Sequence, residues 1–406
     1  STLHSLGFAC IRNAFRGVRV DNRKLDNIVQ ARLGSARETI EIRNLVSKAV
    51  AFAKGNLCSD PHDLATMIDG MVASGQAEWP NDKALTMDRV VADVCWILGQ
   101  CKAQTSVIDF DDMVWFPIVH DLSVWQRDRV FVDETQDLNK CQTALALKAC
   151  KPTGRVCAVG DDRQAIYAFR GADARALDNV VDALGAKVLP LSITYRCASK
   201  IVDLAKQIVP DYEAAPGAPE GEIVTMSVET LKAQAKPGDF VISRANAPLV
   251  GLCLAFLRAG TPARVQGRDI GANLIALVRK SGASSIGDLT AWIDQWAADE
   301  VQRLTRRIPP PEAAIEAVYD KAECIQALCE GAPSVDALLA KIEVMFADSD
   351  DARMVVLGTT HKLKGLERER AFVLGWTYKA GRSVEEANLW YVAVTRAKSY
   401  LGIVTK

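Results

Sequence analysis

The fold is decided by the stretch Val130-Phe131-Val132-Asp133-Glu134-Thr135-Gln136-Asp137, in which two adjacent acids directly follow a short β-branched and aromatic run. Such a run is typical of a buried parallel strand. In an open α/β sheet, ligands bind where the strands end. An aspartate there can hold a hydrated Mg²⁺, and the following glutamate can polarise an attacking water. Taken alone, however, this pattern is better explained by a strand that ends in solvated acids.

Similar apolar runs recur along the chain and end at polar or charged residues. Helical patterns such as those at 139–149 and 198–208 lie between them. This alternation predicts an α/β fold with parallel sheets, and we expect each run to be a buried strand. The further runs are Val156–Val159, Val188–Leu191, Phe240–Ile242, Val355–Leu357 and Phe372–Leu374.

Two long stretches break this alternation. Apolar residues recur at helical intervals from about residue 16 to about residue 104, and again from about 271 to about 350. Pro309-Pro310-Pro311 interrupts the second stretch. Both are predicted to be helical inserts in α/β domains.

The composition limits the class of protein. A chain of 406 residues with 49% hydrophobic residues is expected to form two or three domains, and its net charge of -1 gives no global positive field for nucleic acid. Eleven cysteines without a CxxC pair, and four histidines, predict reduced thiols and no structural metal. Neither a membrane span nor a secretion signal is recognisable. We therefore expect a cytoplasmic protein of bacterial or phage type, with no membrane partner.

A second stretch gives the first stretch a more specific meaning. One predicted helix and one predicted strand after it comes Val159-Gly160-Asp161-Asp162-Arg163-Gln164-Ala165-Ile166-Tyr167-Ala168-Phe169-Arg170-Gly171-Ala172. The pattern GDxxQxIYxFRGA after DExQD resembles motifs III and II of the UvrD/Rep-type superfamily 1 DNA helicases. Together the two motifs are highly specific.

Further segments resemble the other motifs of this family, in the family's order. They are the TxHs segment of motif Ib at 1–6, the LDFDDL stretch at 108–113, motif IV at 191–197, the RxN segment at 243–246, motif V at 359–367 and motif VI at 385–397. Thr194 and Cys197 depart from the usual LxxNYRS of motif IV. The resemblance covers essentially the whole chain outside the two helical inserts.

The resemblance implies two RecA-like parallel-sheet motor domains with helical insertions. The expected parts are a first motor domain at 1–15 and 105–205, a helical insert at 16–104, a second motor domain at 206–270 and 351–406, and a short helical insert at 271–350.

One element of the family is absent from the sequence. Neither the phosphate-binding loop GxxxxGK[ST] nor the upstream glutamine that reads adenine occurs. The first motor domain is therefore expected to be incomplete, by N-terminal truncation or because the natural gene starts here. The full ATP site would need that segment, which a partner chain could supply. The chain as given is expected to bind ATP poorly and to hydrolyse it little or not at all.

The resemblance also assigns residues to a nucleotide site. Asp133 is expected to hold Mg²⁺, and Glu134 to act as the general base. Arg196 and Arg396 are expected to be arginine fingers from different domains, which would couple hydrolysis to domain closure. The other expected nucleotide contacts are Gln164, for the attacking water or the γ-phosphate, Glu367, for the ribose, and Gly365. Each residue singly could be an ordinary surface or interdomain polar residue.

A second set of residues is expected to bind single-stranded DNA. Binding that does not depend on sequence uses aromatic faces for bases and cationic or polar groups for phosphates. By motif position the set is Thr2, His4, Tyr167, Phe169, Arg170, Arg244, Asn246, Thr359 and His361. Phe169 could instead be a core aromatic, and His361 could be a buried, hydrogen-bonded histidine.

The function implied by the resemblance is an ATP-dependent DNA helicase or translocase. Its cofactors would be ATP and Mg²⁺, its partners single-stranded DNA and single-strand/double-strand junctions, and its polarity, taken from the family, 3′ to 5′. Repair, replication and phage pathways are all compatible with it. The alternative is a nucleotide-independent single-stranded DNA-binding or assembly module derived from a helicase. A helicase-nuclease is less favoured, because the sequence shows no appended acidic nuclease site.

Overall fold

The computed structural model describes residues 2–36, 39–73, 76–80, 82, 84–166, 175–306, 310, 312–347, 352–379 and 381–406, without the side chains of residues 313 and 347. The chain divides into two compact units, Ser1–Val188 and Leu189–Lys406. This division differs from the expected domains at residues 189–205, which belong to the second unit. No helix of the described residues is both long and apolar enough to cross a membrane.

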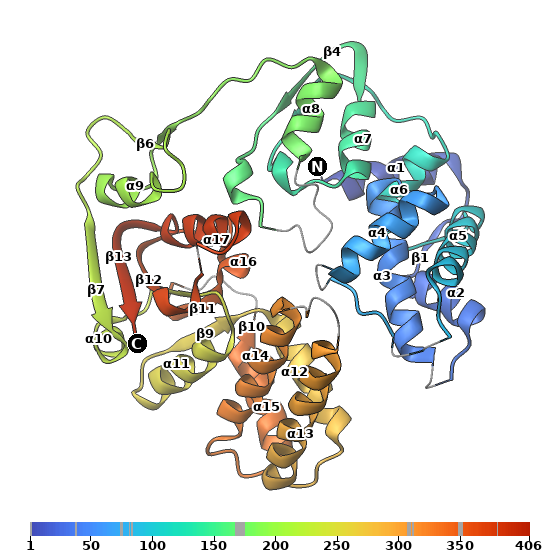
Figure 1. The fold of residues 1–406 in the computed structure, drawn as a ribbon. Coiled ribbons are helices and arrows are strands. Elements are labelled where there is room, and N and C mark those ends of the chain that lie inside the picture. Colours follow the sequence, from blue (N-terminus) through green and yellow to red (C-terminus); the bar gives the residue numbers. More distant parts are fainter. Residues whose placement is uncertain are drawn as a thin grey trace. The chain divides into compact units, whose positions relative to one another are not determined.

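The first unit is mainly helical (Figure 1). Its helices are α1 (Leu3–Ala14), α2 (Lys24–Leu33), α3 (Ile40–Asn56), α4 (Pro61–Ala73), α5 (Met87–Ala103), α6 (Phe110–Val119), α7 (Lys140–Lys148) and α8 (Ala176–Leu184). Its strands are β1 (Arg19–Val20), β2 (Val107–Ile108), β3 (Arg127–Val132) and β4 (Cys150–Ala158). Helices α2 to α5 lie in the expected first insert, which also contains β1.

Helices α1 and α6 pack closely, because a glycine stands at their crossing. A Cβ atom added at Gly7 would lie 1.8 Å from the carbonyl oxygen of Met113, so a larger residue would separate the two helices. The core that they join includes Ile11 of α1, Val46 of α3 and Phe116 of α6, all fully buried.

Two buried lysines tie three helices of this core together. Lys24 of α2 donates to Asp112 Oδ2 at 2.7 Å, and Lys54 of α3 donates to Asp112 Oδ1 at 2.8 Å and to Asp109 Oδ2 at 3.0 Å. Asp109 is the N-cap of α6, and its side chain and that of Asp112 form a reciprocal capping box. Burial alone would lower the pKa of Lys54, but the carboxylates of Asp112 and Asp109 raise it above its ordinary value.

The strand pair of the first unit is parallel but not buried. Strands β3 and β4 pair in register, with Val130 opposite Val156 and Val132 opposite Ala158. Val130 packs against the helical core, whereas the Phe131 side chain on the other face is 74% exposed. The expectation of buried strands is therefore wrong here, because the described residues cover only one face of this two-stranded sheet.

The second unit contains a sheet of seven parallel strands in the order β10-β9-β11-β8-β12-β13-β7. These strands are β7 (Glu222–Ser227), β8 (Phe240–Ser243), β9 (Ala263–Gln266), β10 (Phe346–Ala347), β11 (Val355–Thr359), β12 (Arg368–Leu374) and β13 (Ala397–Thr405). The runs expected as buried strands at 240–242, 355–357 and 372–374 are confirmed, since each is buried in the sheet.

One expected strand is not formed. Val188–Leu191 has no strand structure, and its Val188, Leu189 and Leu191 side chains are exposed. The nearest strand is the short β5 (Ile193–Thr194), which pairs with β6 (Glu213–Ala214) outside the large sheet. An apolar run without a neighbouring strand or a covering helix stays in solvent.

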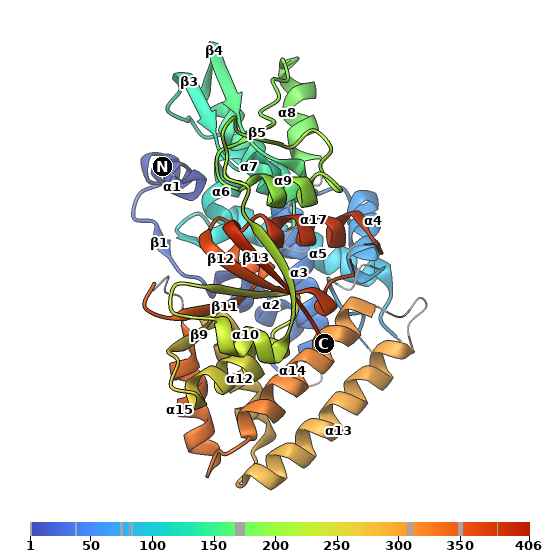
Figure 2. The same cartoon turned by 90° about the vertical axis from the view of Figure 1, so that its left-hand side faces the viewer.

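Helices cover both faces of the large sheet, which explains its apolar strands. The helices of this unit are α9 (Ser199–Ala205), α10 (Val228–Gln234), α11 (Ala247–Arg258), α12 (Arg268–Ser281), α13 (Ile286–Thr305), α14 (Glu312–Cys329), α15 (Val335–Met345), α16 (Thr360–Leu363) and α17 (Val384–Val394). Helices α9 and α17 lie on one face and α10 and α11 on the other (Figures 1 and 2).

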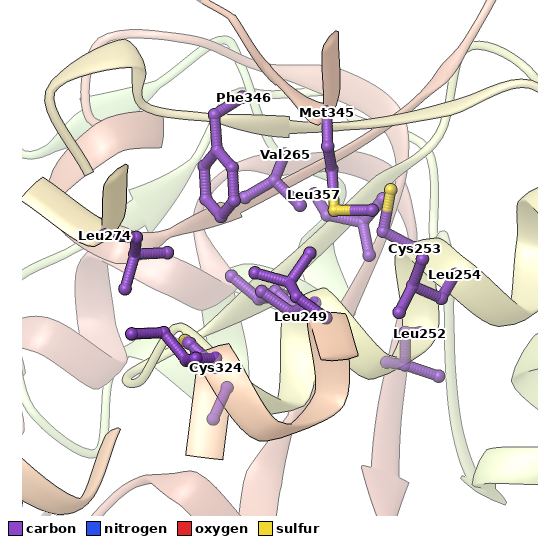
Figure 3. Packing of buried hydrophobic residues seen from close by; sticks show 14 of the residues in the cluster. Leu249, Leu252, Cys253, Leu254, Val265, Leu274, Cys324, Met345, Phe346 and Leu357 are labelled. Carbon is purple, nitrogen blue, oxygen red and sulfur yellow. The ribbon is translucent and has the colours of Figure 1, made fainter. Parts of the chain in front are cut away.

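The helices predicted as a second insert, α12 to α15, share their core with the sheet. Leu274 of α12, Cys324 of α14 and Met345 of α15 pack in one cluster with Leu249 of α11 and Leu357 of β11 (Figure 3). The insert is thus anchored by continuous apolar packing.

Replacement of Asp112 by alanine is expected to destabilise the first unit by about 3–5 kcal/mol, because two buried ammonium groups would lose a carboxylate. Urea unfolding of the 406-residue chain, followed by circular dichroism, measures the change. The control is Asp69→Ala on α4, an exposed acid, with an expected cost below about 0.5 kcal/mol. Equal stability of the two variants would contradict the role of the lysine–aspartate network.

Candidate functional site

The acids predicted to act on the nucleotide lie at the end of β3. Asp133 and Glu134 are both exposed, and Asp133 Oδ1 accepts a hydrogen bond from the Glu134 N–H at 2.9 Å. Glu134 has a φ of 49°, in the left-handed region that residues other than glycine seldom adopt. Such strain is often found at functional sites.

A chain of hydrogen bonds joins the end of β3 to the end of β4. Gln136 Nε2 donates to Glu134 Oε2 at 2.5 Å, and Gln136 Oε1 accepts from the Asp161 N–H at 3.0 Å. Gln164 Nε2 then donates to Asp161 Oδ2 at 2.8 Å. The structure therefore brings Glu134 and Gln164 into one network. Its middle members, Gln136 and Asp161, belong to the two motifs but were not predicted as site residues.

This link depends on a residue without a side chain. A Cβ atom added at Gly160 would lie 2.5 Å from Gln136 Oε1 and 3.3 Å from the Gln136 backbone nitrogen. A larger residue would therefore push Gln136 away from Asp161.

Two of the expected DNA contacts lie at the start of α1. Thr2 is the N-cap of this helix, and its Oγ1 accepts from the Ser5 N–H at 3.2 Å. The His4 ring lies 4.8 Å from the ring of Phe110, and burial lowers the pKa of His4. Thr2 therefore has a structural role that is independent of DNA. Tyr167, Phe169 and Arg170 lie outside the described residues.

A groove of about 580 Å³ runs between α1, β3 and α7. Its lining is apolar along Leu3, Leu6 and Phe131, and it includes both Thr2 and Asp133. A residue expected to contact DNA and the residue expected to hold Mg²⁺ thus line the same groove of the first unit.

In the second unit, one glutamate joins two cations. Arg196 Nε lies 2.5 Å from Glu367 Oε2, and Lys398 Nζ lies 2.8 Å from Glu367 Oε1. Lys398, which donates to this carboxylate, and Arg196 hold the pKa of Glu367 below its ordinary value. Gly365, two residues before, has a φ of 82° and turns the chain from α16 into β12. Lys398 was not predicted, since it lies just beyond the motif VI pattern.

Arg396 is a buried residue, and its side-chain hydrogen bonds among the described residues are to neighbouring groups of the second unit. Its side chain donates to Val392 O at 2.8 Å, to Leu366 O at 3.2 Å and to Thr395 Oγ1 at 3.2 Å. It is 1% exposed, and burial, together with the charge of Arg196, lowers its pKa to about 10. Both arginines belong to the second unit, so the expectation that they come from different domains is wrong.

Four further residues predicted to bind DNA share one edge of the large sheet. Arg244 and Asn246 follow β8, Thr359 ends β11, and His361 follows it in α16. Strands β8 and β11 are parallel neighbours, with Ser243 opposite Thr359. The RxN segment and motif V therefore meet at the carboxyl ends of adjacent strands.

Carboxylates hold the two polar side chains that follow β8. Arg244 Nε donates to Glu386 Oε1 of α17 at 2.9 Å. Asn246 Nδ2 donates to Asp320 Oδ2 of α14 at 2.9 Å. Asp320 was not predicted, because it lies in the helical insert 74 residues away and no motif marks it.

Comparison with known proteins identifies two matching domains. Residues 1–183 match the UvrD/REP helicase N-terminal domain, and residues 354–404 match the UvrD-like helicase C-terminal domain. Over 131 residues the chain is 32% identical to the ATP-dependent DNA helicase PcrA of Bacillus subtilis. This match covers 30% of this chain and 18% of PcrA. Over 205 residues it is 28% identical to the ATP-dependent DNA helicase UvrD1 of Mycobacterium tuberculosis. This match covers 47% of this chain and 25% of UvrD1.

A third relative is DNA helicase II of Escherichia coli, 30% identical over 115 residues, which cover 26% of this chain and 16% of that protein. The matched stretches thus span a quarter or less of the length of these relatives. The two matched domains nevertheless occur in one chain, at its two ends. On these distant and partial matches, the chain belongs to the UvrD-like family of DNA helicases.

Proposed function

We propose that this chain provides part of an ATP-dependent DNA helicase or translocase that moves 3′ to 5′ on single-stranded DNA. The proposal is carried by the network that joins Glu134 to Gln164 across the ends of β3 and β4. Phosphoryl transfer requires that a carboxylate and a water-orienting group be held in fixed relation to the γ-phosphate. A hydrogen-bonded link between adjacent strand ends is a rigid way to hold them.

The exposed acids fit the cation that accompanies ATP. Mg²⁺ prefers oxygen ligands and keeps several of its waters, so one or two carboxylates are sufficient. Asp133 would hold the ion through its exposed carboxylate, and when bound the ion would neutralise charge on the phosphates. Glu134, held by Gln136, would orient the attacking water and accept its proton.

The two arginines are proposed to have different tasks. Arg196 is partly exposed, and so is Glu367, the carboxylate with which it pairs among the described residues, so Arg196 can exchange this carboxylate for a phosphate oxygen. Arg396 would first have to release Val392 and Leu366. We therefore assign phosphate contact to Arg196, and to Arg396 the bracing of the loop that carries Gly365 and Glu367.

The absence of GxxxxGK[ST] from the 406 residues limits what they do alone. This loop supplies backbone N–H groups and a lysine to the phosphates. We propose that this chain by itself hydrolyses ATP very slowly. The same absence favours the alternative function, a single-stranded DNA-binding module that works without nucleotide.

Arg244→Gln is expected to weaken binding of a single-stranded oligonucleotide about tenfold, because a charge-assisted contact to phosphate is lost while Glu386 keeps a hydrogen-bond donor. The slope of log K against log salt should fall by about 0.7 for one lost phosphate contact. Fluorescence anisotropy at several salt concentrations measures both.

The matched control is Arg258→Gln, an exposed arginine of the same unit that pairs with Glu330. It should leave affinity and slope unchanged. Equal effects of the two variants would argue against a DNA site at the edge formed by β8 and β11.

Glu134→Gln is expected to reduce DNA-stimulated ATP hydrolysis at least about 100-fold, since the general base is removed. The assay uses the chain fused to a segment that carries a GxxxxGK[ST] loop. Asp128→Asn, at the other end of β3 and exposed, is the control and should retain full activity. Undiminished hydrolysis by Glu134→Gln would refute the assignment. If the fused protein binds DNA with the same affinity in the presence and absence of nucleotide, the result would favour the DNA-binding module.

A further inference from the structure

The helical insert supplies the N-terminal cap of α11, the helix that follows the RxN segment. Asn246 is the N-cap residue by position, yet its side chain makes no capping hydrogen bond. The carboxylate of Asp320 on α14 takes that place: it accepts from the Asn246 N–H at 3.1 Å and from the Ala247 N–H at 2.7 Å. A cap from another helix satisfies N–H groups that would otherwise be unpaired.

Neighbouring acids hold the same face of α14 in place. Glu312, Glu316 and Asp320 are spaced four residues apart, so they lie along one stripe of the helix. Glu316 pairs with Lys379, and Arg382 Nη1 lies 3.4 Å from Glu312 Oε2. This stripe of α14 therefore contacts α11 through Asp320, and Lys379 and Arg382 through the two glutamates.

Asp320 also determines which end of the Asn246 amide is free. A carboxylate only accepts hydrogen bonds, so the NH₂ group of Asn246 must face it, as the 2.9 Å contact shows. The Oδ1 atom is then left, and it is buried with no hydrogen-bond partner among the described residues. This free group is an acceptor, and a phosphate oxygen is also an acceptor.

We propose that Asp320 is a positioning residue that orients Asn246 so that Oδ1 accepts a hydrogen bond from a base N–H of single-stranded DNA, rather than contacting a phosphate. The inference rests on the proposed function, since it assumes that a strand lies at the edge formed by β8 and β11. Each of the four bases carries an N–H donor on its edge, so the contact does not select a sequence. Arg244 would contact phosphate beside it.

Asp320→Asn separates positioning from capping. Asparagine is a good cap and keeps an acceptor for the Ala247 N–H, so the thermal unfolding midpoint should stay close to that of the wild type. Its new NH₂ group can donate to Asn246 Oδ1, and the Asn246 amide is then free to turn. We expect binding of a single-stranded oligonucleotide to weaken roughly three- to tenfold, as with Asn246→Ala.

The sign of this effect distinguishes it from simple electrostatics. Removal of a negative charge near DNA would by itself tighten binding, whereas the proposed role requires weaker binding at an unchanged salt slope, because no phosphate contact is lost. The double variant Asn246→Ala/Asp320→Asn should bind no more weakly than either single variant. Asp294→Asn, an exposed acid of the same insert that accepts from Gln326, is the control and should bind like the wild type.

An abasic oligonucleotide of the same length provides the chemical test. Wild type and Asn246→Ala should bind it equally well, because the base donors are gone. Tighter or unchanged binding by Asp320→Asn, additive effects in the double variant, or a difference on the abasic strand would overturn the inference while the DNA site itself stands. Failure of the wild-type chain to bind any single-stranded oligonucleotide at low salt would instead overturn the proposed function.

Discussion

Two ammonium groups buried in the first unit, those of Lys24 and Lys54, set the condition that its helices must satisfy. A buried charge is tolerated only when it is paired and hydrogen-bonded. The carboxylate of Asp112 accepts hydrogen bonds from both lysines. Asp109 accepts one from Lys54 and also caps α6. These contacts therefore link α2 and α3 to the N-terminal turn of α6. Because Val130 of β3 packs against this core, the core supports the strand that ends at Asp133 and Glu134.

The second unit uses the same chemistry at its surface. There the carboxylates of Glu367, Glu386 and Asp320 hold Arg196, Arg244 and Asn246. The two arginine pairs are partly exposed, so each costs little to open and is screened by salt. A phosphate oxygen can replace a carboxylate oxygen on an arginine without any rearrangement of the backbone. The site is thus organised before a ligand arrives.

The predictions of strands were most accurate for apolar runs that are buried in the large sheet. The apolar runs of β8, β11 and β12 are strands because both faces of their sheet are covered. The similar run at 130–132 forms a strand that is partly exposed, since a run cannot show what covers it. The family resemblance assigned Arg396 to the nucleotide site as an arginine finger, but did not predict that its guanidinium donates to backbone carbonyls. No sequence pattern marked Asp320, because its role depends on a contact with Asn246, which lies 74 residues away in the sequence.

The strand pair β3–β4 has a consequence for the behaviour of the protein in solution. Phe131 is 74% exposed on this two-stranded sheet and presents an apolar surface to solvent. The sheet edges beside it carry backbone groups that can pair with another chain. Pairing of strand edges would leave this ring exposed, whereas a second apolar surface stacked on the face of the sheet would cover it. The strand that carries Asp133 and Glu134 at its end thus also presents an apolar face that is free to contact another polypeptide.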